Sequence, residues 1–246
     1  MFFQSQVKYY KNIIEKSEAG TYTFTTVKTG IYQVKLVGGG GGSGSFDAKY
    51  YGGWSRWTFA CGGSGAYFYG LIKLEANTTY TVTVGAGGAS TRPNGTSGAG
   101  GNTTISKDST TIISAGGGSG AQCAYYLGAK VTGQGGTLIL GKDVVETYTA
   151  LNGRNGPYGI NKTYQYATSV YDNSNTGYGA SGYGWGDGDD HAGASAGISG
   201  FAQILGYYDS FAATENDYDF KITKSKIYVP VKKENSLIKP YLLLKK

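Results

Sequence analysis

The sequence contains very little of several residue types on which other folds depend. Its 246 residues include four prolines, two cysteines and one histidine. Two cysteines cannot form a disulfide framework, so Cys61 and Cys123 are either two reduced thiols or one mutual bridge. Four prolines, without glycine at every third position, exclude a collagen triple helix. The chain is therefore neither a disulfide-rich scaffold nor a collagen-like fibre.

Long apolar runs are also missing. No stretch approaches the roughly eighteen consecutive apolar residues of a membrane-spanning helix. Residues 1–8 lack the extended apolar segment of a secretory signal peptide. We therefore expect no membrane insertion and no export through a standard N-terminal leader.

Charge is scarce and unevenly placed. Only 15% of the residues are charged, and the formal net charge is +6. In the C-terminal segment, Glu234 is the one acidic residue among the lysines Lys221, Lys224, Lys226, Lys232, Lys233, Lys239, Lys245 and Lys246. Nucleic-acid grooves cluster arginine with stacking aromatics, whereas Arg56, Arg92 and Arg154 are far apart. We therefore interpret the lysines as residues on the solvent faces of edge strands, and we expect no nucleic-acid partner.

A single histidine argues against most classes of enzyme. Residues 193–197 match the Gly-x-Ser-x-Gly nucleophile elbow, but the histidine of that motif follows the serine, and His191 precedes Ser195. Residues 39–44 match Gly-x-Gly-x-x-Gly, but no helix-forming sequence follows to hold a pyrophosphate. Residues 186–191 gather three aspartates and His191 without the spacing of a calcium loop, which favours a solvated loop over a metal site. We expect no enzyme activity, no cofactor and no metal.

Glycine and tyrosine are in excess, with 43 and 23 residues. Linkers rich in glycine are poor in aromatic and β-branched residues, but here glycine tracts alternate with sequences of period two, which is typical of half-buried strands. Tyr22 and Phe24 predict one strand of a hairpin whose partner covers 31–36. Further strands are predicted at 68–74, 79–84, 103–106, 111–114, 137–140, 220–222 and 227–231. The spacing of Val7, Tyr10 and Ile14 predicts a short helix or a docking arm over residues 1–19.

Three predicted strands run directly into glycine tracts, which begin at Gly38, Gly85 and Gly116; two more tracts cover 60–65 and 178–186. A tract without side chains can form an extended helix of three residues per turn, whose backbone groups have no internal partner. Such helices are stable only when they pair with one another.

We therefore predict an all-β fold, a β-sandwich whose glycine-rich tracts pack as polyglycine II-like helices; mobile glycine loops are the alternative. In this interpretation residues 1–19 form the arm or helix, and residues 20–246 form one glycine-rich β domain. If that domain divides, we expect the subregions 20–121 and 122–246.

Large aromatic rings occur in glycine-flanked segments that lack strand or helix spacing. Rigid rings beside small residues are typical of binding loops; alternatively, the rings cover the glycine bundle, because large exposed apolar patches are rare. The candidate receptor-contact residues are Tyr50, Tyr51, Trp54, Arg56, Trp57, Tyr125, Tyr126, Tyr178, Tyr183, Trp185, Asp187 and His191.

The order of strands and tracts carries a family resemblance. It consists of AGTYTF at 19–24, VKLVGGGGG at 34–42, GGSGAY at 62–67, YTVTVGAGG at 80–88 and ISAGGGSG at 113–120. This succession resembles the glycine-rich domains of bacteriophage tail and tail-fibre proteins, well over residues 19–121 and loosely elsewhere. In the adhesins of T-even-like phages, aromatic segments between glycine tracts contact the receptor; the matching segments here are 50–57, 123–127 and 178–191. The lysine-rich segment after Phe220 departs from the pattern.

The resemblance implies a non-enzymatic receptor-binding component of a phage tail or tail fibre, located in the virion and facing outwards. The implied partners are a host cell-surface glycan or outer-surface protein and other phage structural proteins, and the fibre analogy implies a homotrimer. The alternative function is that of a virion assembly or decoration subunit, in a head fibre or baseplate, whose loops bind another phage protein.

Overall fold

The computed structural model describes residues 9–49, 55–91, 95–123, 130–160, 165–186, 192–208, 220–222 and 228–230. Residues 12–206 form one compact unit, and residues 1–11 with 207–246 form a second. Within the second unit, β19 (Phe220–Ile222) pairs antiparallel with β20 (Tyr228–Pro230), which confirms both strands predicted there. Among the described residues there is no helix that could cross a membrane.

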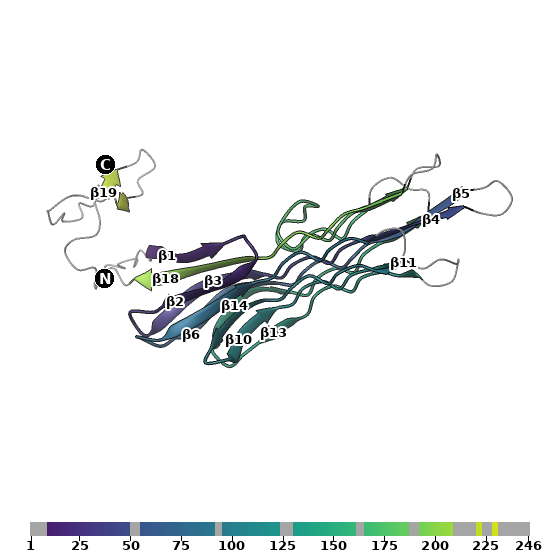
Figure 1. Ribbon diagram of the computed structural model, residues 1–246. Coiled ribbons are helices and arrows are strands. Elements are labelled where there is room, and N and C mark those ends of the chain that lie inside the picture. The colour runs from purple at the N-terminus through teal and green to yellow at the C-terminus, as the bar shows by residue number, and fades with distance from the viewer. Residues whose placement is uncertain are drawn as a thin grey trace. The chain divides into compact units, whose positions relative to one another are not determined.

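The compact unit 12–206 has a sandwich of two five-stranded sheets at one end (Figure 1). The first sheet contains, in spatial order, β1 (Tyr9–Lys16), β18 (Phe201–Tyr208), β3 (Gly30–Val37), β6 (Tyr67–Leu74) and β14 (Val144–Leu151). The second contains β13 (Leu138–Leu140), β10 (Thr110–Ala115), β9 (Thr103–Lys107), β7 (Thr79–Val84) and β2 (Gly20–Thr25). The all-β sandwich predicted from the sequence is confirmed.

Alternation along the strands builds the sandwich core. In β3, Tyr32, Val34 and Leu36 are buried, whereas Gln33 and Lys35 between them are partly exposed. Fully burying a large apolar side chain stabilises a fold by about 1.5–3 kcal/mol. The largest fully buried side chains in this core are Tyr80, Phe68, Leu36, Ile72, Leu74, Ile105, Ile113, Ile204 and Val34.

The predicted hairpin between residues 21–25 and 31–36 is wrong. β2 pairs with β7, whereas β3 pairs with β6 and β18 in the other sheet. The connection 26–29 therefore crosses from one layer of the sandwich to the other. Phe24 and Tyr32 face the same core from opposite sheets. A period of two reveals which face of a strand is buried but not which strand lies beside it.

The N-terminal segment is extended where it is described, so a helix over residues 9–16 is wrong. Residues 1–8, which include Val7, lie outside the described residues, and the docking arm stays a prediction. Residues 9–16 form β1, which lies beside β18 at the edge of the first sheet. Ile14 is buried in the sandwich core, and Ile13 packs against it. The segment forms a strand because its apolar side chains are buried against the sheet. A spacing of three to four residues is only weak evidence for a helix in so short a stretch.

The predicted pair across residues 107–109 is confirmed, because β9 and β10 form an antiparallel hairpin. Asp108 and Ser109 both have positive φ, at 47° and 65°. Two central residues in this region define the turn whose twist matches that of the flanking strands. The short strand predicted at 137–140 is also confirmed as β13.

Beyond the sandwich, eight segments of six residues run without strand or helix assignment and together form the glycine bundle (Figure 1). These tracts are 38–43, 61–66, 85–90, 97–102, 116–121, 132–137, 152–157 and 195–200. A shorter segment, 179–183, joins them. Six residues amount to two turns of a helix with three residues per turn.

The tract 38–43, here called the central tract, donates its backbone hydrogen bonds in rotation. Its first and fourth N–H groups donate to tract 61–66, its second and fifth to tract 97–102, and its third and sixth to tract 195–200, at 2.8–3.1 Å. Because the partner repeats every third residue, the tract has the predicted polyglycine II geometry.

The central tract has six neighbours. Its carbonyl groups accept hydrogen bonds from three further segments, 85–91, 116–121 and 179–183. The six neighbours also bond to one another in a closed ring, in the order 61–66, 116–121, 97–102, 85–90, 195–200 and 179–183. Tracts 132–137 and 152–157 lie outside this ring, bonded to each other and to its members.

Glycine is required in the central tract because neighbouring backbones occupy the space of a side chain. A Cβ on Gly40 would lie 1.9 Å from the carbonyl oxygen of Ala180, and one on Gly41 would lie 2.1 Å from that of Ser119. Real Cβ atoms essentially never approach another heavy atom so closely. The outer tract 132–137 has room for side chains on one face, so Gln134 and Thr137 are exposed while Gly133 and Gly136 are buried.

Candidate binding surface at the end of the bundle

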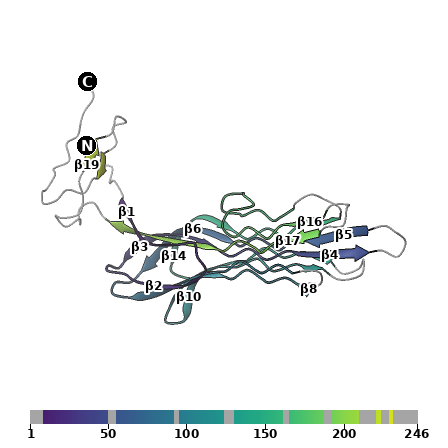
Figure 2. The same cartoon turned by 45° about the horizontal axis from the view of Figure 1, so that its top comes forward.

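The end of the bundle opposite the sandwich carries three small antiparallel sheets (Figure 2). The first contains β4 (Gly44–Lys49), β5 (Ser55–Ala60) and β15 (Tyr158–Ile160), and the second contains β8 (Gly95–Thr96), β11 (Gln122–Cys123) and β12 (Lys130–Val131). The third contains β16 (Gly184–Gly186) and β17 (Ala192–Ala194). These strands continue directly from the glycine tracts, so the bundle determines where each one starts.

Close contacts tie the small sheets to one another. A Cβ on Gly184 would lie 2.7 Å from Cδ2 of Phe59, so β16 passes directly over this buried ring of β5. Gly184 also exchanges two backbone hydrogen bonds with Gln165, both 2.9 Å. The N–H of Thr91 donates to the carbonyl of Ser43 at 3.2 Å, which holds the chain beside the start of β4. The small sheets are therefore positioned by backbone contacts rather than by a large core.

Five segments connect these strands and lie outside the described residues: 50–54, 92–94, 124–129, 161–164 and 187–191. The described residues that flank each segment all lie at this end of the bundle. Seven of the predicted receptor-contact residues belong to these segments, namely Tyr50, Tyr51, Trp54, Tyr125, Tyr126, Asp187 and His191. The topology thus brings the described residues that flank all five segments to the same end of the bundle.

Four other candidates lie on described residues at the same end. In the β4–β5 hairpin, Arg56 is opposite Ala48 and Trp57 is opposite Asp47. In the β16–β17 pair, Trp185 is opposite Gly193. The side chain of Tyr183 is 42% exposed, and its N–H donates to Oγ of Ser195 at 2.9 Å.

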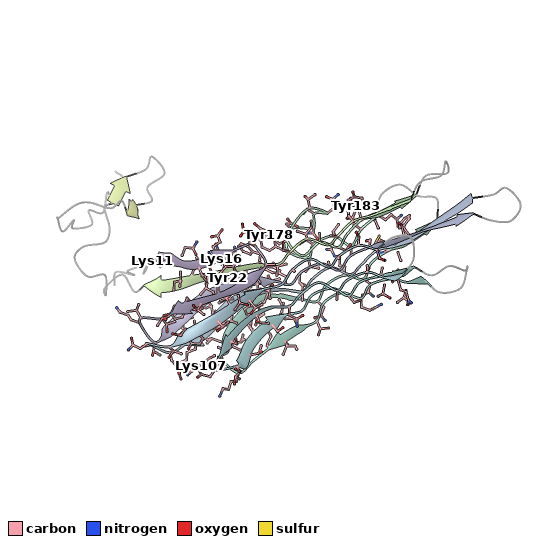
Figure 3. All side chains as sticks on the ribbon, in the orientation of Figure 1. Lys11, Lys16, Tyr22, Lys107, Tyr178 and Tyr183 are labelled. Atoms are coloured by element: carbon pink, nitrogen blue, oxygen red, sulfur yellow. The ribbon has the colours of Figure 1, made fainter. Side chains whose placement is uncertain are left out.

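Tyr178 lies apart from these residues, nearer the sandwich, as Figure 3 shows by comparison with Tyr183. Its ring stacks on Phe201 with 4.7 Å between centroids and an angle of 13°. Tyr171 and Tyr67 join the same cluster. Burial, reinforced by Tyr171 and Tyr69, raises the pKa of Tyr67 to about 12, so its phenol is neutral at physiological pH. Tyr178 therefore packs within an aromatic cluster beside the sandwich, and its contact with a receptor stays a prediction.

No group of three or more metal-binding side chains occurs in the part of the chain that the structure describes. The thiol of Cys61 is buried and donates to the carbonyl oxygen of Gln165 at 3.0 Å. The side chain of Cys123 lies outside the described set.

Sequence reasoning missed the residues that hold the small sheets together, in particular Phe59, Thr91 and Gln165. It also missed β18 and β14, whose sequences contain enough β-branched and aromatic residues to predict strands. One signal was available for the bundle itself. Glycines three residues apart, at 133 and 136 and at 153 and 156, recur in the two tracts outside the ring, and Gly133, Gly136 and Gly156 are buried.

A β-sandwich continued by a bundle of polyglycine II-like helices defines an all-β protein of the glycine-rich class. The chain matches the glycine-rich domain family over residues 16–216 and therefore belongs to that family. The matched region includes nearly all of the compact unit 12–206. No curated protein matches the chain significantly.

Proposed function

We propose that this protein is a non-enzymatic adhesion component of a phage tail or tail fibre, which binds a host-surface glycan or outer-surface protein. One observation carries the proposal: five connecting segments, two of them rich in aromatic residues, are anchored at the same end of a bundle whose backbones interlock. Rigid anchoring lowers the entropy that a binding loop loses when it meets its ligand.

The composition of these segments supports the same function. Tyr50, Tyr51 and Trp54 lie between β4 and β5, and Tyr125 and Tyr126 lie between β11 and β12. Aromatic side chains beside glycine and serine provide contact area at low conformational cost, as in antibody loops. The phage assignment rests on the sequence resemblance and is tested separately from binding.

Binding of purified protein to intact host cells and to a glycan array tests the proposal. Trp54→Ala and Trp185→Ala are expected to weaken binding at least tenfold, while Val27→Ala, at an exposed position of the sandwich connection, leaves it unchanged. Tyr178→Ala is expected to lower thermal stability without a selective loss of binding. Thermal melting of each variant separates lost binding from lost folding.

Unchanged cell binding by the two tryptophan variants would contradict the adhesion proposal and favour a virion assembly subunit. In that case the same variants should fail to incorporate into virions. Labelled antibody on purified virions tests the location directly, because an adhesion component of the tail must be labelled at the tail or its fibres.

A further inference from the structure

The outer face of the second sheet carries a regular array of hydroxyl groups. Along β2, β7, β9 and β10, core residues such as Val82 and Ile105 alternate with residues on the opposite face. On these four strands all ten residues of that outer face are threonine or serine, namely Thr21, Thr23, Thr25, Thr79, Thr81, Thr83, Thr104, Ser106, Thr111 and Ser114. These ten residues are here called the hydroxyl face.

The strand register places most of the hydroxyl face in two rows that cross the four strands. The first row contains, in spatial order, Thr21, Thr83, Thr104 and Ser114, and the second contains Thr23, Thr81, Ser106 and Thr111. Neighbouring strands lie about 4.8 Å apart, so each row is about 14 Å long. The hydroxyl groups of a row therefore recur at a fixed interval across the sheet.

Most of these hydroxyl groups are accessible and have no partner in the protein. Ser114 is buried, whereas the other nine residues are exposed or partly exposed. Oγ1 of Thr25 and Oγ1 of Thr79 share one hydrogen bond of 2.9 Å. Within the described residues, no other hydrogen bond joins a hydroxyl of this face to the protein. Because a hydroxyl group can donate one hydrogen bond and accept two, the hydroxyl face has capacity to bind a ligand.

The composition of the hydroxyl face argues against several kinds of partner. None of its ten residues is charged, so a nucleic-acid backbone would meet no lysine or arginine there. None is aromatic, whereas the cores of protein interfaces are enriched in aromatic residues and their hot spots contain few serines and threonines. A neutral partner rich in hydroxyl groups complements this face both in charge and in hydrogen bonding.

The outer face of the first sheet has a different composition. There the register places Gln203, Lys35 and Tyr69 in one row. These side chains interact within the protein: Nε2 of Gln203 donates to Glu15 at 2.9 Å, and Nζ of Lys35 lies 5.3 Å from the centre of the Tyr69 ring. Threonine is common in strands because its branched side chain suits a pleated surface. That preference applies equally to both sheets, so it does not account for the difference between them.

We propose that the hydroxyl face binds a neutral polysaccharide, which lies across the strands along one of the two rows. This site is on the sandwich, and it does not depend on the proposed adhesion through the loops. Sugar rings present hydroxyl groups at intervals close to the spacing between strands. A sugar chain can also follow the twist of the sheet by rotation about its glycosidic bonds. Because one hydrogen bond to a hydroxyl contributes little, binding requires several contacts along a row.

Affinity electrophoresis of the full chain, in native gels that contain a soluble β-glucan, a mannan or dextran, tests the proposal. At least one of these neutral polysaccharides is expected to retard the protein. The double variant Thr81→Val and Thr83→Val removes one hydroxyl from each row and keeps the shape of the side chains. It is expected to weaken binding about fivefold or more, the usual effect of a lost hydrogen bond. Thermal melting should show no loss of stability, because valine is favoured in strands.

Two control variants separate this site from other surfaces of the molecule. Thr147→Val with Thr149→Val makes the same chemical change on β14 of the first sheet, and Trp54→Ala alters a loop at the end of the bundle. Both are expected to bind the polysaccharide as the unaltered protein does. The absence of retardation in all three gels overturns the proposal. Retardation that is lost with Trp54→Ala but kept with Thr81→Val and Thr83→Val also overturns it, and would support the loops as the glycan site.

Discussion

The sandwich and the glycine bundle satisfy the same backbone requirement in opposite ways. In the sandwich, strands pair in two directions, and side chains of period two fill the space between the sheets. In the bundle, the central tract has six neighbours, because residues 38–42 have no side chains to hold the neighbouring backbones apart. The comparison shows that removing side chains can raise the number of backbone partners of a segment. Stability then depends on close backbone contact rather than on apolar volume.

A side chain introduced into the central tract should destabilise the bundle without changing how the sandwich packs. Gly40→Val is expected to lower the free energy of unfolding by about 3 kcal/mol or more, because its Cβ meets the backbone of Ala180 and overpacking is strongly destabilising where the surroundings cannot move. Gly30→Ala in β3 is the control, since nothing lies within 4 Å of its Cβ. Denaturant titration of both variants measures the difference; equal stabilities would show that the tracts yield easily.

A smaller loss of stability is expected at the edge of the bundle, where a side chain rather than a neighbouring backbone accepts a hydrogen bond. Oδ1 of Asn155 accepts the N–H of Gly135 at 2.9 Å. Asn155→Ala is expected to cost about 1 kcal/mol, the usual contribution of one such hydrogen bond. Asn155→Asp keeps the accepting oxygen and should retain most of the stability. The same loss in both variants would assign the role of Asn155 to something other than this bond.

The smallest effect is expected at the end of the sandwich far from the bundle, where Lys107 forms an ion pair with Glu75 (Figure 3). The hydrogen bond from Lys107 lowers the pKa of Glu75, and the same bond raises the pKa of Lys107. The contribution of Glu75 is therefore present above its unfolded pKa and lost as the pH falls through its lower folded value.

Lys107→Ala should reduce stability slightly at neutral pH, and this difference should vanish in acid once Glu75 is protonated. Added salt should reduce it as well, because exposed ion pairs are screened. Denaturant titrations at neutral and acidic pH, with and without salt, measure this. A difference that persists in acid would mean that the lysine acts through packing of its aliphatic stem.

The sequence predicts the sandwich and the bundle because both have periodic signals. Val34 and Leu36 alternate with polar residues, and the glycine tract after Val37 contains no side chain that could pair it with an ordinary core. The pairing partners of β2 and β3 could not be predicted, because the alternation of Phe24 is the same in a hairpin and in two facing sheets. The helix expected near Ile14 failed because its short spacing signal was outweighed by burial against β18.

The candidate surface is predictable only in part. The sequence identifies aromatic segments such as 50–54, but it contains no signal that their flanking strands meet at one end. That arrangement follows from the hydrogen-bonded ring of tracts, which depends on contacts between residues more than a hundred positions apart, such as Gly40 with Ile198. Tyr178 has the same local sequence character as Tyr183, yet it stacks on Phe201 beside the sandwich.

The uniform six-residue length of the tracts limits how this scaffold can evolve. One inserted residue would turn the rest of a tract by about 120°, since three residues complete a turn, and every later N–H group would point at the wrong neighbour. A viable change of bundle length therefore needs three residues added to all tracts together. Insertions between β4 and β5, or between β16 and β17, meet no such requirement, so lineages of this protein should diverge at the ends of those hairpins while the interior keeps its dimensions.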